Sequence, residues 1–227
     1  MRMTALIRGD IRFQFKYGFY FLYLVFSVLY ISLLSALPIA WKAQAAVLMI
    51  FTDPAAMGLF FMGAIVLFEK SEQVLNSIAI SPVKPIEYVI SKLVTIAVIS
   101  TGVALLIGAG GGVIGNPLYF VPGVFLGSCL FSAVGLMVAA NIASLNQFIV
   151  ATIPAELLIN IPAFAWMFGW KPGILLLHPG VCIIELCDNG AHALPALAIL
   201  IVWTALITLA AERVVRNSLR SLGGVKL

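Results

Sequence analysis

Six long apolar runs constrain this chain more than any other feature. They fall at residues 19–40, 45–68, 86–114, 119–140, 147–168 and 194–211. A helix needs about 20 apolar residues to cross a bilayer core about 30 Å thick. Since 63% of the 227 residues are hydrophobic and 10% are charged, little is left for a soluble domain. The sequence therefore predicts an all-α polytopic membrane protein, a single transmembrane domain over 1–227 with six transmembrane helices.

Lysine and arginine are unevenly distributed between these runs. If both termini face the cytoplasm, only Lys42 and Lys171 of the 13 basic residues lie on the far side of the membrane. Cytoplasmic loops carry the excess of positive charge in membrane proteins. We therefore expect a multi-pass protein of the plasma (inner) membrane with both termini cytoplasmic. The net charge of +4 reports this topology, and no nucleic-acid partner is expected.

Residues 1–17 are predicted to form an amphipathic elbow helix in the headgroup layer. Arg8, Arg12 and Lys16 recur every four residues, so their stems can snorkel toward water. The apolar residues beside them are Met3, Ile7, Ile11 and Phe15. An ordinary positive anchor for the first span is an equally good interpretation, and it gives the same topology.

A polar stretch, residues 69–84, separates the second and third runs. Val74, Leu75 and Ile78 recur at helical spacing against polar neighbours, so the first part should be a short amphipathic helix. Pro82 should end it, and Pro85 suits the first turn of the next helix because its missing N–H costs nothing there. The chain is thus expected to turn sharply on the cytoplasmic side.

Residues 173–190 contain two apolar pieces, 174–177 and 181–186, that are too short to cross the membrane. We expect short re-entrant helices at the outer face before the sixth span, provided that protein covers their backbone. Cys182 and Cys187 could pair there. In a helix they would lie on different faces, so free thiols are the favoured interpretation.

Motifs for chemistry on this chain are missing. No G-x-x-x-x-G-K-[ST] occurs, so any driving ATPase must be another chain. The glycines of residues 110–115 match G-x-G-x-x-G but close an apolar run. Since Gly108 and Gly112, and also Gly111 and Gly115, lie four residues apart, close helix contact is the favoured interpretation. His178 and His192, with Glu185 and Asp188, have no metal-site spacing. No catalytic residues, metal site or cofactor are therefore expected on this chain.

Glu156 lies about ten residues into the fifth run, and Asn160 follows one turn later. An intramembrane carboxylate suggests a partner for a cationic substrate or a proton, although a hydrogen-bonded glutamate between helices is an even alternative. Phe61 and Met62 could line an apolar substrate pathway, but a lipid-facing helix has the same composition. Asp53 is expected at the outer boundary.

The run FEKSEQVLNSIAISPVKPIEYVISKL resembles the connection between the second and third spans in permeases of ATP-binding-cassette exporters for drugs, polysaccharides and lipids. The resemblance rests on Glu69 at the end of a span, Ser81-Pro82, and Tyr88 with Lys92. The elbow helix, six spans and outer re-entrant segment extend it along the chain. Small drug-export permeases of the fluoroquinolone type are the most similar.

This resemblance implies a coupling helix over residues 69–84 that docks a separate ATPase, which would hold ATP and Mg²⁺. The implied ATPase-coupling residues are Glu69, Lys70, Glu72, Gln73, Leu75, Asn76, Ser81, Pro82 and Lys84. It also implies a second permease subunit, alike or different, contact with membrane lipids, and export of a small amphipathic molecule such as a drug or lipid. The loop NIASLNQF between the fourth and fifth spans is uncharged, which departs from the family pattern and argues against a strong second ATPase contact there. Any such contact would be left to Asn141, Asn146 and Gln147.

Two other functions remain open at this stage. An ion- or proton-coupled transporter or channel would use Glu156 as its coupling site. A membrane enzyme would need clustered His, Asp or Ser at one membrane face, and the sequence offers only scattered ones.

Overall fold

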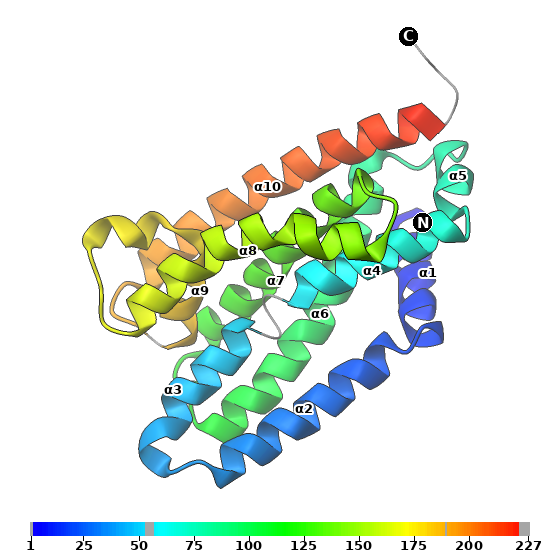
Figure 1. Cartoon of the computed structure of the whole chain (residues 1–227). Coiled ribbons are helices and arrows are strands. Elements are labelled where there is room, and N and C mark those ends of the chain that lie inside the picture. Colours follow the sequence, from blue (N-terminus) through cyan, green and yellow to red (C-terminus); the bar gives the residue numbers. More distant parts are fainter. Residues whose placement is uncertain (1, 53–56, 189, 223–227) are drawn as a thin grey trace.

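The computed structural model describes residues 2–52, 57–188 and 190–222. For residues 221 and 222 it describes the backbone alone. Every regular element in these ranges is a helix (Figure 1). In chain order the elements are α1 (Arg2–Lys16), α2 (Phe19–Ala36), α3 (Ile39–Ile50), α4 (Met57–Ser71), α5 (Val74–Ala79), α6 (Pro85–Gly111), α7 (Pro117–Ala140), α8 (Leu145–Met167), the 3₁₀ helix η2 (Gly173–Leu177), α9 (Pro179–Cys187) and α10 (Ala193–Leu222). The prediction of an all-α protein is confirmed.

Five helices, α2, α6, α7, α8 and α10, are long and apolar enough to cross a membrane. Their outward faces carry large apolar side chains that remain exposed, such as Phe21, Val28, Val150 and Leu206. A water-soluble surface rarely exposes so much contiguous apolar area. The chain is therefore a multi-pass membrane protein.

The second expected span, residues 45–68, differs from the structure because two shorter helices replace it. The first span, expected to reach residue 40, ends at Ala36, and α3 begins directly after Pro38. A π-helical turn at Phe51 and Thr52 closes α3, and α4 begins at Met57. Residues 53–56, which include Asp53, lie between α3 and α4 and outside the described residues.

The other ends follow local signals. Pro85 and Pro117 occupy the first turns of α6 and α7, and Asn116 Oδ1 accepts from Leu118 N at 3.0 Å to cap α7. Gly112, with φ of +68°, ends α6 in the left-handed conformation. These helices differ from the expected spans by only a few residues, whereas α10 continues as one helix well beyond residue 211.

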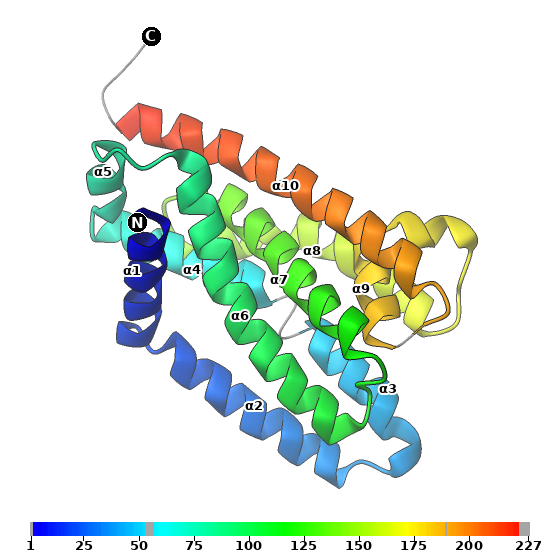
Figure 2. The same cartoon turned by 180° about the vertical axis from the view of Figure 1, so that it is seen from behind.

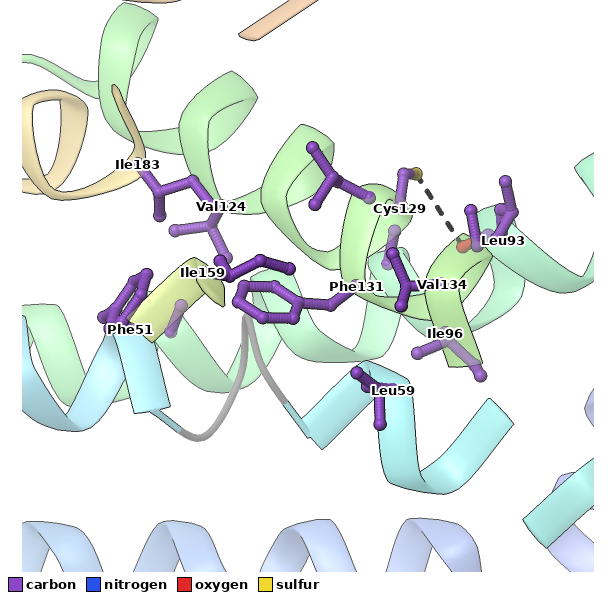
Figure 3. Packing of buried hydrophobic residues seen from close by; sticks show 14 of the residues in the cluster. Phe51, Leu59, Leu93, Ile96, Val124, Cys129, Phe131, Val134, Ile159 and Ile183 are labelled. Atoms are coloured by element: carbon purple, nitrogen blue, oxygen red, sulfur yellow. Dashed lines mark hydrogen bonds between the residues drawn. The ribbon is translucent and has the colours of Figure 1, made fainter. Parts of the chain in front are cut away.

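Helix α7 forms the centre of the fold and packs against α4, α6, α8, α9 and α10. Figure 3 shows Phe131 of α7 among Phe51, Leu59 and Ile159 from three other helices. Small residues let the neighbours approach closely. A Cβ on Gly135 would lie 2.2 Å from the backbone oxygen of Leu59. The tight α4–α7 contact therefore depends on this glycine.

The glycines near the end of α6 have different roles. A Cβ on Gly111 would lie 2.3 Å from Ala46 Cβ of α3, so this glycine does allow a close helix contact. Gly112 faces open space and serves the turn instead. The prediction of close packing is thus confirmed at Gly111 and wrong at Gly112.

The molecule has two distinct ends (Figures 1 and 2). One end gathers α1, α5, the C-terminal part of α10 and the α7–α8 turn. The other gathers the α2–α3 corner, the α6–α7 turn, η2 and α9. We call them the α5 end and the α9 end. The N-terminal helix and the end of α10 thus lie at the same end.

At the α9 end, η2 and α9 form the short helices expected for residues 173–190. Every residue of α9 is buried, so other protein segments cover its backbone. Glu185 accepts from Trp166 Nε1 at 3.2 Å and from the His192 backbone at 3.1 Å, joining α8, α9 and the start of α10. Cys182 and Cys187 are free and buried, as favoured from their helical spacing.

Candidate functional site

The α5 end contains a buried group of charges that joins three helices. Lys92 of α6 is 1% exposed, and its Nζ lies 2.5 Å from Asp10 Oδ1 of α1 and 2.5 Å from Glu69 Oε1 of α4. Tyr88 donates to Glu69 Oε2 at 2.7 Å, and Ser91 donates to Asp10 Oδ2. We call these five residues the charged cluster.

The charged cluster fixes α4 and α1 against the start of α6. Removing charges from water is costly, and the cost is offset only when each charge is paired and hydrogen-bonded. Here both carboxylates have a second donor besides Lys92. One turn further along both helices, Gln14 Nε2 donates to Thr95 Oγ1 at 3.0 Å. The elbow helix is therefore locked to α6 through polar contacts.

In the chain, helix α5 lies between α4 and α6, two of the three helices that the charged cluster joins. It starts after Gln73, whose φ of +57° reverses the chain at the end of α4. It ends at Ala79, Ile80 is its C-cap residue, and Ser81 Oγ donates to the Ile78 oxygen at 2.7 Å. Lys84 N then donates to Glu87 Oε2 at 2.9 Å at the start of α6. Short turns on both sides leave α5 little freedom to move independently of α4 and α6.

The two faces of α5 differ in polarity, as the amphipathic pattern predicted. Leu75 is buried, with Val215 and Leu219 of α10 lining the same small internal space. Asn76 and Ser77 are exposed. The helix thus presents a polar surface outward while its apolar side packs on the end of α10.

The predicted ATPase-coupling residues differ in their exposure. The exposed members are Glu72, Gln73, Asn76, Pro82 and Lys84. Ser81 is half-buried, and Leu75 packs inward. Glu69 belongs to the last turn of α4 and lies within the charged cluster. The short helix therefore covers Val74–Ala79 and not the whole of the expected 69–84.

Lys70 also belongs to α4 and turns toward the α7–α8 turn. Its Nζ donates to the backbone oxygens of Ala139, Ala140 and Ile142 at 2.7, 2.8 and 2.9 Å. A cation at the end of a helix satisfies carbonyls that have no partner within the helix. Beside this contact, Asn141, Asn146 and Gln147 are exposed at the α5 end.

The four predicted pathway residues lie on two helices. Met62 is fully buried, and Phe61 packs edge-on against Phe19 and Tyr23 of α2. Glu156 and Asn160 are half-buried on α8. The structure does not gather these four residues into one of the hollows described for the chain.

Two neighbours show which way Glu156 and Asn160 face. Phe164, one turn beyond Asn160, packs edge-on against Phe51 at the end of α3. Glu156, Asn160 and Phe164 are spaced four residues apart and so share one face of α8. This face is directed toward the end of α3. Asn160 Oδ1 is buried without a hydrogen-bond partner.

Asp10 is the charged residue of the cluster that the sequence reasoning missed. The elbow helix was expected to present Arg8, Arg12 and Lys16 beside an apolar stripe, yet its buried residues are Asp10 and Gln14. Phe15 of that stripe is 74% exposed. Asp10 and Gln14 lie four residues apart, so a polar stripe on the helix was the available signal.

The histidines and acids of the outer segment do not form a metal site in the described ranges, where no three potential ligands gather. His178 begins α9, whereas His192 and Asp188 are exposed beyond its end. Glu185 is held by the contacts to Trp166 and the His192 backbone.

Comparison with known proteins places the chain among export permeases. The model of the fluoroquinolones export permease protein family matches residues 1–217. Fluoroquinolones export permease proteins from two strains of Mycobacterium tuberculosis are each 27% identical over 180 residues, which cover 78% of this chain and 76% of theirs. The helical membrane fold and a family match along nearly the whole chain lead to one conclusion: this chain belongs to the fluoroquinolones export permease protein family.

Proposed function

We propose that this chain is the membrane-spanning subunit of an ATP-driven exporter, and that a separate ATPase docks on α5. The observation that carries the proposal is the polar, exposed surface of a short helix that is clamped between α4 and α6. ATP and Mg²⁺ would bind to the ATPase chain. The family membership supports a permease that exports small molecules.

The charged cluster gives α5 the mechanical connection that such a subunit needs. A push on α5 reaches α4 and α6 through short turns, and the contacts of Lys92 with Asp10 and Glu69 carry it to α1. A ligand or partner shifts a conformational equilibrium only through different interactions with the two states. Closure of an ATPase dimer would supply that difference at α5.

Orientation follows from the same assignment. Docking on α5 places the α5 end in the cytoplasm, together with the N-terminal helix and the end of α10. The basic residues concentrate at this end, which supports the cytoplasmic side. The membrane would be the plasma (inner) membrane.

A second permease subunit and lipids would cover the outward apolar faces of α2 and α8. Most of each helix is unburied, and Leu24, Val28, Val150 and Leu157 are among the exposed side chains. The pathway would run beside α8, where Glu156 offers a carboxylate to a cationic amphipathic substrate. Asn160, Phe61 and Met62 would contribute to the same route.

A cysteine at Asn76 is expected to crosslink to the ATPase. The three native cysteines are buried and free, and burial raises the pKa of Cys182 and Cys187 to about 12, so they should not react at neutral pH. The measurement is crosslinking of N76C in native membranes, followed by mass spectrometry. We expect an ATP-binding protein as the main product.

Ala191→Cys supplies the matched control, since Ala191 is exposed at the α9 end. It should give no ATPase adduct. Capture of the ATPase by neither variant, or by both equally, would remove α5 as the docking site.

Glu156→Gln is expected to impair export of cationic substrates at least ten-fold more than export of neutral ones. The substitution preserves the shape of the side chain but removes the negative charge that would pair with a cationic substrate in the membrane. Uptake into inverted vesicles, with a matched cationic and neutral substrate pair, measures the effect. Asp188→Asn, on an exposed acid at the α9 end, should leave both rates unchanged. Equal losses for both substrates in Glu156→Gln would exclude a charge-pairing role.

A further inference from the structure

A groove of about 550 Å³ opens at the α5 end, between α5, the start of α6 and the last turns of α10. Figure 2 shows these three segments side by side, in agreement with the contacts of α10 with α5 and α6. The volume lies within the range of about 300–1,000 Å³ that is usual for ligand sites. The charged side chains of its lining are Lys84, Arg216, Arg220 and Glu212. Basic side chains therefore outnumber acidic ones in the groove.

Two of these basic side chains are available to a ligand. Glu212 is 6% exposed and accepts from Arg216 Nε at 3.0 Å and from Arg216 Nη2 at 2.5 Å. Glu87, at the start of α6, accepts from the backbone N–H of Lys84. Within the described residues, no acid lies at ion-pair distance from Lys84 or Arg220, and both are exposed. Arg216 also keeps N–H donors that Glu212 does not use, because a guanidinium has five.

The rest of the groove is apolar. Its apolar lining residues come from all three segments and include Ile78, Ile80, Val83, Ile86 and Leu219. Ile80 is 85% exposed. A small hydrophilic anion would pair with the basic side chains but would leave this apolar surface in water, which is unfavourable. The lining therefore fits an anion that also carries an apolar part.

The face of α10 that borders the groove continues into the membrane. Val202, Leu209 and Arg216 are seven residues apart, close to two helical turns, and so share one face. Val202 and Leu209 are 57% and 55% exposed. Arg216 lies five residues beyond Ala211, the end of the last apolar run, or about 8 Å along the helix axis. The headgroup layer begins at this depth, so a lipid whose acyl chains lie along Leu209 and Val202 places its phosphate near Arg216.

The groove lies on a different side of α5 from the surface proposed for the ATPase. By helical spacing, Ile78 and Ala79 share the side of Leu75, which faces α10. Asn76 and Ser77 lie on the other side and are exposed. A lipid in the groove and an ATPase on α5 can therefore be bound at the same time.

We propose that this groove binds one anionic phospholipid, with its phosphate on Lys84, Arg216 and Arg220 and its acyl chains along the apolar face of α10. Arginine donates paired N–H bonds to phosphate, and lysine adds a compact positive charge. Basic side chains at the end of a membrane helix attract anionic headgroups. A zwitterionic lipid fills the same space but brings a positive charge next to the basic side chains. The site goes beyond the export function and does not depend on the ATPase.

The test uses the full chain in phosphatidylcholine nanodiscs that contain a trace of phosphatidylglycerol with a diazirine in its acyl chain. Labelled positions are mapped by mass spectrometry. We expect labelling to concentrate on the segments of α6 and α10 that line the groove. Unlabelled phosphatidylglycerol should compete at least ten-fold better than extra phosphatidylcholine with the same acyl chains. Combining Lys84→Gln with Arg220→Gln should lower the labelling about ten-fold.

The matched control combines Arg8→Gln with Arg12→Gln, which removes the same number of charges from exposed positions of α1 at the α5 end. It should lower labelling of the groove less than two-fold. A large excess of glycerol 3-phosphate, which has the phosphate but no acyl chain, should not displace the probe.

Three results would overturn the proposal: equal competition by the two lipids, displacement by glycerol 3-phosphate, or an equal loss of labelling in the two double variants. Displacement of the probe by the ATPase would also overturn it, because the groove would then belong to the ATPase surface. The labelling itself requires neither ATP nor transport, so failure here is distinguishable from failure of the export function.

Discussion

Replacing Lys92 with methionine is expected to destabilise the protein by about 3–5 kcal/mol, because it leaves two buried carboxylates without their shared cation. Asp10 and Glu69 would then face each other at the site where Lys92 Nζ now lies 2.5 Å from an oxygen of each. The free energy of unfolding in a detergent titration measures the loss. Export should fall as well, since α1 and α4 lose their connection to α6.

Two further variants separate the buried pairing from a general loss of charge. Lys16→Met removes a pair with Glu72 whose side chains are 68% and 41% exposed, and exposed pairs contribute about 0–1 kcal/mol. The triple change Asp10→Asn, Glu69→Gln and Lys92→Met should recover much of the lost stability, because no unpaired charge remains. If Lys92→Met and Lys16→Met were equally stable, the described pairing of Lys92 with two buried carboxylates would be contradicted.

The second large effect is expected at Gly135, where substitution by alanine should lower the free energy of unfolding by about 1–3 kcal/mol through overpacking. The added Cβ would lie 2.2 Å from the Leu59 oxygen and 2.9 Å from its carbonyl carbon. These are backbone atoms and cannot rotate away, so α4 and α7 must separate. The same unfolding titration measures this cost.

Gly102→Ala is the matched control within a neighbouring helix. Nothing lies within 4 Å of a Cβ at Gly102, and alanine has the higher helix propensity by about 1 kcal/mol. This variant should be at least as stable as the unsubstituted protein. A Gly135→Ala protein of unchanged stability would mean that the α4–α7 contact is looser than described.

The crossings could be predicted because their signals are local. Apolar length, flanking proline and the distribution of basic residues specify α6, α7 and α8 closely. The start of α3 at Ile39, six residues before the expected second crossing, was not predicted. Apolar residues continue on both sides of Pro38, so composition does not report where one helix ends and the next begins.

The site was predictable only in part. The amphipathic pattern of residues 74–79 and the resemblance at Glu69, Tyr88 and Lys92 pointed to the α5 end, where the charged cluster lies. Asp10 reaches Lys92 across 82 residues of sequence, and no local pattern reports such a contact.

The proposed exporter subunit combines a docking helix, a buried charged connection and a set of membrane helices in one chain. It requires that energy enters from a partner at the α5 end. An ion-coupled transporter that uses Glu156 would instead take its energy from a gradient across the membrane. The two sources can be removed independently.

The most direct measurement is uptake of a fluoroquinolone into inverted membrane vesicles that contain this chain and its native partners. We predict uptake that requires MgATP, persists when an uncoupler removes the proton gradient, and is lost when the α5 surface carries Asn76→Trp. Uptake that an uncoupler abolishes and that continues without ATP would contradict the central claim.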